Sequence, residues 1–563
     1  MAEEEKEQKK YEIETIKEIA EAKKKAAKGR GITFKPYVDD VKTRTAMVEE
    51  KRQKIITVPA SEKLLAKLRS RNKLTARERL NLFFDEGTFV EEDMFIESQI
   101  KAFGMGERYT PADGVVGGFG KVDGRLICAY ATDYSVLAGA SGEGHMMKIS
   151  KITRRACDMR VPIVGFLDSA GVRLQEAQPS AVAYGELYYL QSQFSGVVPQ
   201  IMIICGGVAA GQAYSPLLTD IIIMTRTGGD MWIGGPRAAA GVTGGVEDIT
   251  GIGGADYHMK YTGQCHLAVD DDEEAIKACK RVLSYLPSNC DEMPPDIPPT
   301  DDPYRREERL LEILPKDPRR SYDAHEIVDL IADKGSFMEF QDEYAKQVII
   351  GFGRFDGHVA GIYAGNPAYL AGCFEPDSCD KLVRHFTFCD CFNIPIIYLV
   401  DNPALIVGDE WERKGLIRHG TKLLHTTNTL TVPRISILVR KVYGGTMAFF
   451  SSRGKVADFV YAWPTAELCP MGPDGAVSII YDREIKSLPT SEERLAFAEE
   501  KKKEYFHTYV DPIEVAKNAR ISQFDDIIDP RRTRETIINA LKLCKTKKDW
   551  HTPPGRKHTN RPV

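Results

Sequence analysis

The sequence has 563 residues, of which 43% are hydrophobic and 28% are charged. These values are typical of a globular protein and exclude an intrinsically disordered chain. The net charge of −5 at pH 7 argues against a dedicated nucleic-acid binder, because no overall positive field attracts phosphate groups. At about 150 residues per domain, the length predicts two to four domains.

Cysteine usage and the first residues of the chain indicate a cytoplasmic protein. The twelve cysteines are scattered, and a chain of this size needs no disulfides, so we expect reduced thiols. Cys389 and Cys391 are too close for the usual zinc spacing, and we predict no metal site. The first ten residues lack an apolar signal region, and no run of 18 apolar residues occurs, so we expect no membrane span of its own.

The chain opens with a segment of helical pattern. Between residues 3 and 28 acidic and basic residues alternate, with isoleucines on one stripe, which predicts an amphipathic helix used for packing or oligomer contacts. A basic run over 63–79 leads into an amphipathic segment at 80–84 and a turn at 85–87. We take residues 1–72 as a helical N-terminal extension.

Strands and helices alternate from about Asp113 onward. Residues 119–130 read as two strands that turn at Asp123 and Gly124, and residues 145–159 read as a helix. The apolar runs 161–167 and 201–205 are typical of buried strands, with a second helix between them. This order predicts an α/β fold in which helices cover a sheet.

The pattern occurs twice. Residues 118–168 and 351–401, offset by 233, share 14 identities in 51 positions without a gap. The similarity extends on both sides at offsets of 248 and 234. A duplication of one domain is therefore predicted.

A proline-rich connection separates the two copies. Residues 287–318 hold eight prolines and many charges, which is linker composition. We predict an N-terminal domain over 73–290, a linker over 291–320, a C-terminal domain over 321–543 and a basic tail over 544–563.

Two loops in each copy follow predicted strand ends and consist largely of small residues: 168–173 and 206–211 in the first, 401–405 and 443–446 in the second. Sites in α/β folds lie where loops leave the carboxyl ends of strands. Small residues let a ligand approach the backbone, and amides at the start of a helix point outward. Helix–strand packing explains any one such loop, but four at duplicated positions favour a paired site that stabilises an oxyanion.

Other catalytic motifs are absent from the sequence. It has no Gly-x-Ser-x-Gly elbow, His-Glu-x-x-His pair or phosphate-binding loop. His145, His385 and His419 have no partner at helical spacing, and we interpret them as polar contacts. The acidic run 270–274 is interpreted as a helix N-cap and not as a metal site.

Several motifs resemble the carboxyltransferase subunits of biotin-dependent acyl-CoA carboxylases and decarboxylases. They include Asp168-Ser-Ala-Gly-Val-Arg-Leu-Gln-Glu176, Tyr214-Ser-Pro216, Tyr443-Gly-Gly445, Tyr461-Ala-Trp-Pro-Thr-Ala-Glu467 and Asp529-Pro-Arg531. The resemblance runs from about residue 73 to about 543 and is strongest to propionyl-CoA carboxylase β-subunits; glutaconyl-CoA decarboxylase α-subunits belong to the same group.

The resemblance implies two crotonase-like domains, with active sites between the N-terminal domain of one subunit and the C-terminal domain of another, in a homo-hexamer or homodimer. It implies transfer of a carboxyl group between N1′ of biotin and the α-carbon of an acyl-CoA, so that coenzyme A enters as the acyl-CoA substrate. One oxyanion hole would hold the enolate oxygen of the thioester and the other the ureido oxygen of biotin. The biotin that remains after it has lost CO₂ would itself take the α-proton, so no separate base is needed.

The resemblance also assigns residues. The thioester hole falls on the amides of Ala170 and Gly171, and the biotin hole on those of Gly445 and Thr446. The substrate-binding residues carried over are Val172, Gly206, Gly207, Gly211, Tyr214, Ala404 and Ala448. Glycine is usual where this chain has Ala170 and Ala404, and alanine where it has Thr446; backbone amides tolerate such changes where φ is negative.

Ala448 departs from the acidic residue usual in propionyl-CoA carboxylases. A small alanine leaves apolar volume, which predicts an acyl group larger than acetyl or propionyl, unless Met447 and Phe449 fill the space.

The sequence contains no biotinylation motif and no ATP-binding domain, so the resemblance implies a biotin carrier on another protein. With a biotin carboxylase as partner, the chain completes an acyl-CoA carboxylase. With a membrane sodium-pump subunit, it is the α-subunit of a glutaconyl-CoA-type decarboxylase. A hydrolase or hydratase on the same fold, and an inactive assembly subunit, are the remaining alternatives.

Overall fold

The structure is a computed structural model that describes residues 14–21, 40–235, 240–241, 252–317, 319–452, 455–517 and 524–547. It divides into two compact units, 1–58 and 59–563. In the first unit residues 14–21 are helical and α2 spans Val41–Thr57. The rest of the predicted amphipathic helix, and the basic tail from residue 548 on, lie outside the described residues.

The first half of the larger unit contains one eight-stranded sheet with the order β1-β2-β3-β4-β5-β6-β8, in which β7 pairs with β5. The antiparallel hairpin of β2 and β3 is followed by parallel strands. The strands are β1 Val90–Glu91, β2 Val115–Val122, β3 Arg125–Thr132, β4 Ile163–Ser169, β5 Gln200–Ala209, β6 Ile221–Thr225, β7 Asp230–Trp232 and β8 Leu267–Val269. The helices used below are α4 Ala76–Phe83, α5 Glu143–Asp158, α6 Gln178–Gln193, α7 Gly211–Leu217 and α10 Asp272–Tyr285.

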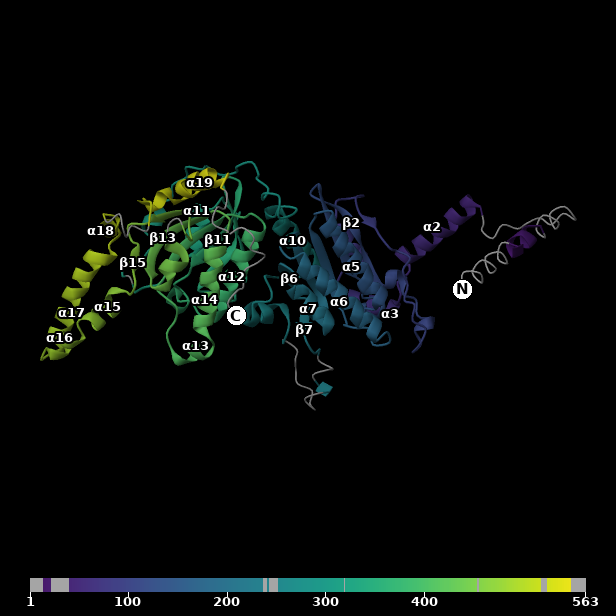
Figure 1. Cartoon of the computed structure of the whole chain (residues 1–563), viewed down its shortest axis with the longest axis horizontal. Helices are drawn as coiled ribbons and strands as arrows, with labels where there is room; N and C mark the ends of the chain where they lie inside the picture. The colour runs from purple at the N-terminus through teal and green to yellow at the C-terminus, as the bar shows by residue number, and fades with distance from the viewer. Residues whose placement is uncertain are drawn as a thin grey trace, which may run out of the picture. The chain divides into compact units, whose positions relative to one another are not determined.

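The second half repeats this arrangement, with the order β16-β14-β13-β12-β11-β10-β9 and with β15 paired to β13. Its strands are β9 Met338–Phe340, β10 Val348–Phe355, β11 His358–Gly365, β12 Ile396–Asn402, β13 Arg434–Tyr443, β14 Phe459–Ala462, β15 Glu467–Cys469 and β16 Asp526–Ile527. Its helices include α11 His325–Ile331, α12 Pro376–Cys391, α14 Leu416–Thr429 and α19 Thr533–Cys544, and a π-helical turn, η7, spans Met447–Ser451. Figure 1 shows these elements along the chain.

The duplication predicted from the sequence is confirmed in the fold. The hairpin β2–β3, helix α5 and strand β4 have the same bounds as β10–β11, α12 and β12 after a shift of 233, and β5 matches β13 after a shift of 234. Even the isolated bridges agree, because Ser141 pairs with Val172 and Phe374 pairs with Leu405 at the same shift. The predicted hairpin turn and the buried strand near residues 161–167 are also present.

Helices cover both faces of each sheet, as an α/β fold requires. In the first sheet α5 and α6 pack with Ile163, Leu167 and Met202 on one face, and α4 and α10 lie on the other. In the second sheet α12 and α14 cover one face, and α11 and α19 the other. The acidic run before α10 caps that helix as interpreted, since the Asp271 side chain accepts from the Glu274 amide.

The two halves are packed directly on each other within the larger unit. The ring of Tyr285, the last residue of α10, lies 5.8 Å from that of Phe352 on β10. The Gln341 amide donates to the carbonyl of His266 at 2.9 Å. The residue that follows β9 is therefore bonded to the residue that precedes β8. A continuous apolar core therefore joins the two copies.

Candidate functional site

Both predicted loops of the first repeat leave neighbouring parallel strands at the same edge of the sheet. Strand β4 ends at Ser169 and β5 at Ala209, and the two strands are paired. Gly171 has φ +94°, and a Cβ there would lie 3.1 Å from the Ala209 carbonyl. Glycine is favoured here because this positive φ strains other residues, and the closeness of the two loops leaves little room for a side chain.

The amides of Ala170 and Gly171, assigned above to the thioester hole, are already engaged. Ala170 donates to the carbonyl of Ala138 at 3.0 Å, and Gly171 donates to Ser169 Oγ at 3.1 Å. Neither Ala170 nor Ala404 is among the residues with positive φ, so the backbone at both positions accepts an alanine. As folded here, these amides are not available to a ligand.

On the neighbouring loop one amide is engaged and the next two are free to bind a ligand. Ala210 has φ 55° and ψ −130°, and its amide donates to the carbonyl of Trp232 at 3.2 Å. The next two residues, Gly211 and Gln212, open α7, and within the described part of the chain their amides have no protein acceptor. Such outward N–H groups attract a developing negative charge.

Tyrosines surround this opening. The Tyr188 hydroxyl donates to the Gly211 carbonyl, and the Tyr188 ring lies 6.2 Å from that of Tyr214, which is exposed. The Tyr184 hydroxyl and Ser141 Oγ are hydrogen-bonded at 2.6 Å. Desolvation raises the pKa of Tyr188 to about 12, so these hydroxyls act as neutral donors near pH 7.

The remaining residues predicted in the first repeat have different environments. Val172 is half-buried and forms a bridge with Ser141. A Cβ on Gly206 would lie 1.9 Å from Asp168 Oδ1, whereas one on Gly207 would only touch Trp232. Gly206 is therefore required for packing against the Asp168 carboxylate.

The second repeat presents the equivalent opening. The Gly444 amide donates to the Cys469 carbonyl at 3.1 Å, and the amides of Gly445 and Thr446 have no acceptor among the described residues. Thr446 is buried and donates from Oγ1 to Asn402 Oδ1 at 2.7 Å. These two residues correspond to Gly211 and Gln212 at the offset of 234.

Ala404 and Ala448 are the remaining residues predicted in the second repeat. The Ala404 carbonyl accepts from the Phe374 amide at 3.0 Å, which extends the bridge between Phe374 and Leu405. The Ala448 residue is exposed, whereas Phe449 is buried. A Cβ on Gly445 would lie 3.5 Å from the Phe449 ring, so Phe449 closes the loop from inside and leaves Ala448 facing outward.

A buried carboxylate supports each pair of loops. Asp168 lies 3.5 Å from Lys73 Nζ and 3.7 Å from an Arg79 nitrogen. Its equivalent, Asp401, accepts from Arg440 at 3.0 Å and from the Tyr322 hydroxyl at 2.9 Å. Because both carboxylates are buried and paired with cations, their role is to hold the strand ends in place.

Arg173 fixes the end of the first loop. It is buried and donates to Asp113 Oδ1 at 2.7 Å and to Glu176 Oε1 at 2.6 Å. The same carboxyl groups accept from the His145 and Glu143 amides at the start of α5. Burial raises the pKa of Asp113; it acts in the same direction on Glu176, but the hydrogen bonds from Glu143 and Arg173 leave the pKa of that carboxyl below its ordinary value.

The histidines are polar contacts, as interpreted from the sequence. His145 is buried with Nδ1 3.1 Å from the Asp113 carbonyl, and desolvation lowers its pKa to about 3. His385 has a pKa lowered to about 3 by burial, and His419 lies 3.0 Å from Asp380. In the described segments no cluster of three His, Cys, Asp or Glu side chains could hold a metal.

Sequence reasoning missed two features of the structure. One is the polar network that links Asn402 to Thr446, which was hidden because the two residues are 44 positions apart. The other is a cavity of about 620 Å³ beside the β2–β3 hairpin. No helix in the described ranges has both the length and the apolar character needed to cross a bilayer.

Comparison with known proteins identifies sequences and structures that are similar to this chain. The model of the carboxyl transferase domain matches residues 67–560. A propionyl-CoA carboxylase carboxyltransferase subunit of Haloferax mediterranei is 40% identical over 92% of this chain and 98% of its own length. The methylmalonyl-CoA decarboxylase α-subunit of Veillonella parvula is 38% identical over 93% and 99%. A transcarboxylase 12S crystal structure, described with methylmalonyl-coenzyme A bound and as a hexamer assembly, superposes with a TM-score of 0.88 at 37% identity, covering 93% of this chain and 99% of that one.

Proposed function

The chain belongs to the carboxyl transferase family and is a biotin-dependent acyl-CoA carboxyltransferase, and we propose that it uses the two loop openings as a pair of oxyanion holes. The duplicated pair of outward amides carries this proposal: Gly211 and Gln212 in one repeat, Gly445 and Thr446 in the other. One opening would take the thioester and the other the biotin.

We place the thioester hole at Gly211 and Gln212. This placement moves the donors from Ala170 and Gly171, whose amides are engaged by Ala138 and Ser169. The thioester oxygen becomes an enolate oxygen when the α-carbon gains or loses a carboxyl group, and each positioned N–H is worth roughly 3 kcal/mol to that charge. Val172, Gly207 and Tyr214 form the wall beside it.

The second opening fits the ureido oxygen of biotin. Two adjacent backbone N–H groups, of Gly445 and Thr446, match one carbonyl-type acceptor. Biotin, borne by a separate carrier protein, supplies the N1′ that gives or takes the carboxyl group. Within this chain the Thr446 hydroxyl and Asn402 hold the loop, and Ala404 follows the end of β12 beside it. Ala448 faces outward, where it would meet the acyl chain of a thioester held by the N-terminal domain of another subunit.

The direction of the reaction depends on the partner. Similarity to a propionyl-CoA carboxylase subunit favours carboxylation with a biotin carboxylase and a biotin carrier. Similarity to methylmalonyl-CoA decarboxylase α-subunits favours the reverse direction as the second candidate. We also propose assembly of several copies, because the 12S relative is described as a hexamer.

The first experiment needs no partner protein. The purified chain is incubated with malonyl-, methylmalonyl-, ethylmalonyl- or glutaconyl-CoA, with and without free biotin, and loss of CO₂ is followed. Decarboxylation that depends on biotin is expected. Thioester hydrolysis without biotin would identify a hydrolase, and binding of CoA esters without turnover would identify an inactive assembly subunit.

A matched pair of variants tests the second hole. Gly445→Pro removes the N–H, whereas Gly445→Ala keeps it and adds nearly the same Cβ, which would meet Leu405 and Phe449 only at 3.4–3.5 Å. We expect the proline variant to lower the biotin-dependent rate about 10²-fold or more below that of the alanine variant. Equal rates would show that this amide is not a donor in the reaction.

A further inference from the structure

The second opening is held by a side-chain contact that the first opening lacks. The Tyr443 hydroxyl donates to Glu467 Oε2. Tyr443 is the last residue of β13, and Glu467 is the first residue of β15, which runs parallel to β13 and pairs with it. The contact therefore joins the two strands at the point where the chain leaves β13 for the loop of Gly445 and Thr446.

The strand register identifies the equivalent positions in the first repeat. After the offset of 234, β7 pairs with β5 in the same register as β15 pairs with β13. Asp230 begins β7 as Glu467 begins β15, but the equivalent of Tyr443 is Ala209. The first repeat thus keeps a carboxyl group at this place and has no hydroxyl beside it to donate.

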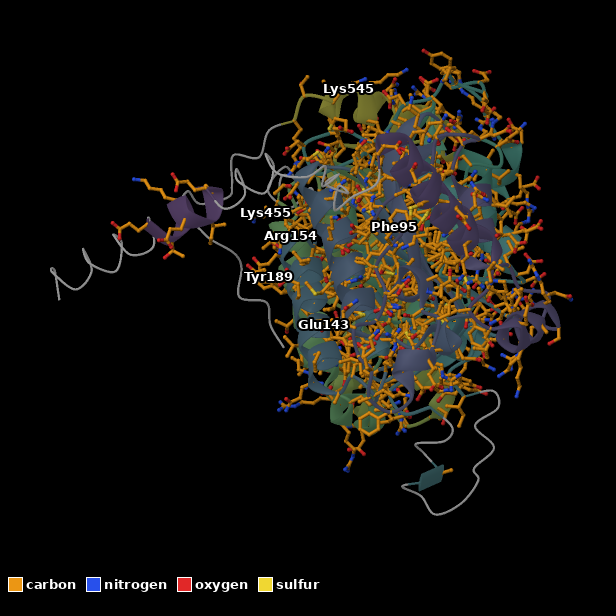
Figure 2. The ribbon with its side chains drawn as sticks, turned by 90° about the vertical axis from the view of Figure 1, so that its right-hand side faces the viewer. Phe95, Glu143, Arg154, Tyr189, Lys455 and Lys545 are labelled. Carbon is orange, nitrogen blue, oxygen red and sulfur yellow. The ribbon has the colours of Figure 1, made fainter. Side chains whose placement is uncertain are left out.

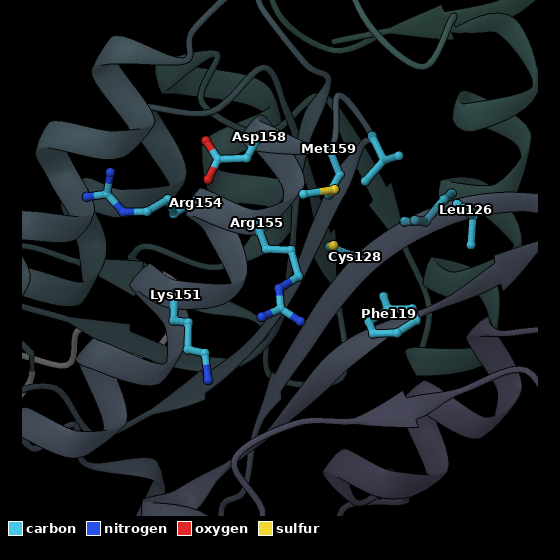
Figure 3. A pocket seen from close by; sticks show the side chains of 10 residues that line it. Phe119, Leu126, Cys128, Lys151, Arg154, Arg155, Asp158 and Met159 are labelled. Atoms are coloured by element: carbon cyan, nitrogen blue, oxygen red, sulfur yellow. The ribbon is translucent and has the colours of Figure 1, made fainter.

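Because both repeats have the same fold, a contact found in only one of them is not required by the fold. Some differences arise where one repeat covers the other. Phe119 lines a surface cavity (Figure 3), whereas its equivalent, Phe352, packs against Tyr285 of the first repeat. Packing of the repeats does not explain the contact between Tyr443 and Glu467, since both side chains belong to the second repeat. The contact is a property of the second opening.

Packing also fixes the Tyr443 ring. The residue before α15, which spans Pro473–Ile480, is Gly472. A Cβ on Gly472 would lie 2.8 Å from a carbon of the Tyr443 ring, so any other residue would displace the ring. Gly472 has φ −56° and ψ 154°, a conformation open to all residues. The ring, and not the backbone, therefore explains the glycine.

The Tyr443 hydroxyl is a neutral donor to a carboxylate. Burial and the negative charge of Glu467 raise the pKa of Tyr443. Hydrogen bonds to an ionised group are stronger than those between neutral groups, and both side chains are half-buried. The contact is thus able to hold β15 firmly against β13.

Movement of β15 would reach the two amides of the second opening directly. The Cys469 carbonyl, on β15, accepts from the Gly444 amide at 3.1 Å, and the Gly444 carbonyl accepts from the Met447 amide at 3.2 Å. Gly445 and Thr446 lie between these two hydrogen bonds. Their N–H groups stabilise a developing charge only when they are held at hydrogen-bond distance and aimed at it.

We propose that Tyr443 and Glu467 are positioning residues for the biotin half of the reaction, because their contact sets the direction of the two amides of the second opening. The first opening is held by a different tyrosine, since the Tyr188 hydroxyl donates to the Gly211 carbonyl. The inference rests on the proposed function, in which the second opening takes the ureido oxygen of biotin. Removing the contact should therefore affect biotin and not the CoA ester.

The test measures decarboxylation by the full-length chain with free biotin and the malonyl-type CoA ester that the parent turns over fastest. Tyr443→Phe removes the donor and Glu467→Met removes the acceptor, whereas Glu467→Gln keeps an oxygen that accepts from the hydroxyl. We expect the first two variants to raise the KM for biotin about tenfold and the glutamine variant to stay within about threefold of the parent. The KM for the CoA ester should not change. Tyr189→Phe, at an exposed ring on α6 (Figure 2), is the control that should match the parent.

The two KM values separate positioning from a general loss of structure. Partial unfolding lowers the apparent kcat and leaves both KM values unchanged. Gly472→Ala gives an independent check, because it displaces the ring and keeps both polar groups, and it should also raise the KM for biotin. An unchanged KM for biotin in Tyr443→Phe and Glu467→Met would overturn the inference, as would equal increases in both KM values.

Hydrogen exchange distinguishes this inference from the proposed function. In Tyr443→Phe the amides of Gly444 and Met447 should exchange about tenfold faster than in the parent, because the loop opens more often. Mass spectrometry of peptides from residues 440–452 measures it, with Tyr189→Phe again as the control. Faster exchange in an enzyme without biotin-dependent turnover would argue against the proposed function alone. Biotin-dependent turnover with unchanged exchange and unchanged KM values would argue against the positioning contact alone.

Discussion

The Thr446 hydroxyl donates to Asn402 Oδ1 at 2.7 Å, and the Asn402 amide group donates to the Gly372 carbonyl. The first repeat has a related link at the equivalent place, where Ser169 Oγ donates to the Gly139 carbonyl at 2.7 Å. Both Thr446 and Asn402 are fully buried. In the second repeat this pair ties the end of β12 to the amides that open η7.

Thr446→Val should therefore weaken the second hole. Valine keeps the shape but leaves Asn402 Oδ1 without its donor, which costs roughly 1–3 kcal/mol and lets the loop shift. We expect the biotin-dependent rate to fall about tenfold, chiefly through a higher KM for free biotin. Thr446→Ser keeps the hydroxyl and should restore most of the rate; a serine variant as slow as the valine variant would contradict this role.

Ala210 holds a backbone conformation that favours glycine, with φ 55° and ψ −130°. A non-glycine residue in such a region costs on the order of 1–3 kcal/mol. Ala210→Gly should therefore raise the free energy of unfolding or leave it unchanged, in contrast to the usual loss on replacing alanine by glycine. Denaturant titration of Ala210→Gly measures it, with Ala213→Gly inside α7 as the control that should lose stability.

Asp220 should make stability depend on pH. Burial raises its pKa to about 6, although Arg384 and the Gln200 amide oppose the shift. The folded state binds this proton more tightly than the unfolded state does, so this group favours folding most at low pH and its contribution declines between about pH 4 and pH 6. At pH 7 the ionised carboxylate remains a cost of roughly 3 kcal/mol.

Asp220→Asn removes this titration but keeps an oxygen to accept from the Gln200 amide. We expect the difference in unfolding free energy between variant and parent to favour the variant progressively as the pH rises from 4 to 7. Urea titrations at several pH values would reveal it. A difference that stays constant over this range would show that Asp220 is not the titrating group.

A buried lysine that donates to backbone carbonyls occupies the same position in both repeats. Lys381 Nζ donates to three carbonyls, of Gln341, Tyr344 and Val348, at 2.7–2.9 Å. Its equivalent in the first repeat, Lys148, donates to the carbonyl of Val115 at 2.7 Å. Lys381→Met should lower the unfolding free energy by about 3 kcal/mol or more, because three buried carbonyls lose their donor. A loss no greater than that of an exposed lysine, such as Lys277→Met, would refute this role.

Much of the fold was predictable because the duplication gives two independent readings of each element. The buried strand predicted at 161–167 is found at Ile163–Ser169, and its equivalent at Ile396–Asn402. The availability of individual amides was not predictable. The Ala170 amide is taken by the carbonyl of Ala138, which lies before α5 and on a different loop, and such a contact follows from the packing of loops and not from any local pattern.

Which of two equivalent surfaces is exposed was likewise not predictable from the sequence. The sequence pattern of Phe119 and Phe352 is the same at both positions, yet Phe352 is covered and Phe119 lines a cavity. Only the placement of one repeat on the other distinguishes them. Periodicity identifies which side chains leave a sheet on one face, but not what covers that face.

The short side chain of Ala448 predicts which acyl groups the enzyme accepts. The residue is exposed beside the buried Phe449, and its short side chain leaves room for a substrate chain longer than propionyl. Turnover of acetyl-, propionyl-, butyryl- and crotonyl-CoA should therefore favour the four-carbon substrates. Ala448→Ile fills the space and should shift the kcat/KM preference from butyryl-CoA toward acetyl-CoA by on the order of tenfold, since the two methylenes by which they differ are worth roughly 0.8 kcal/mol each when buried. A clear preference of the parent enzyme for acetyl-CoA would contradict this assignment.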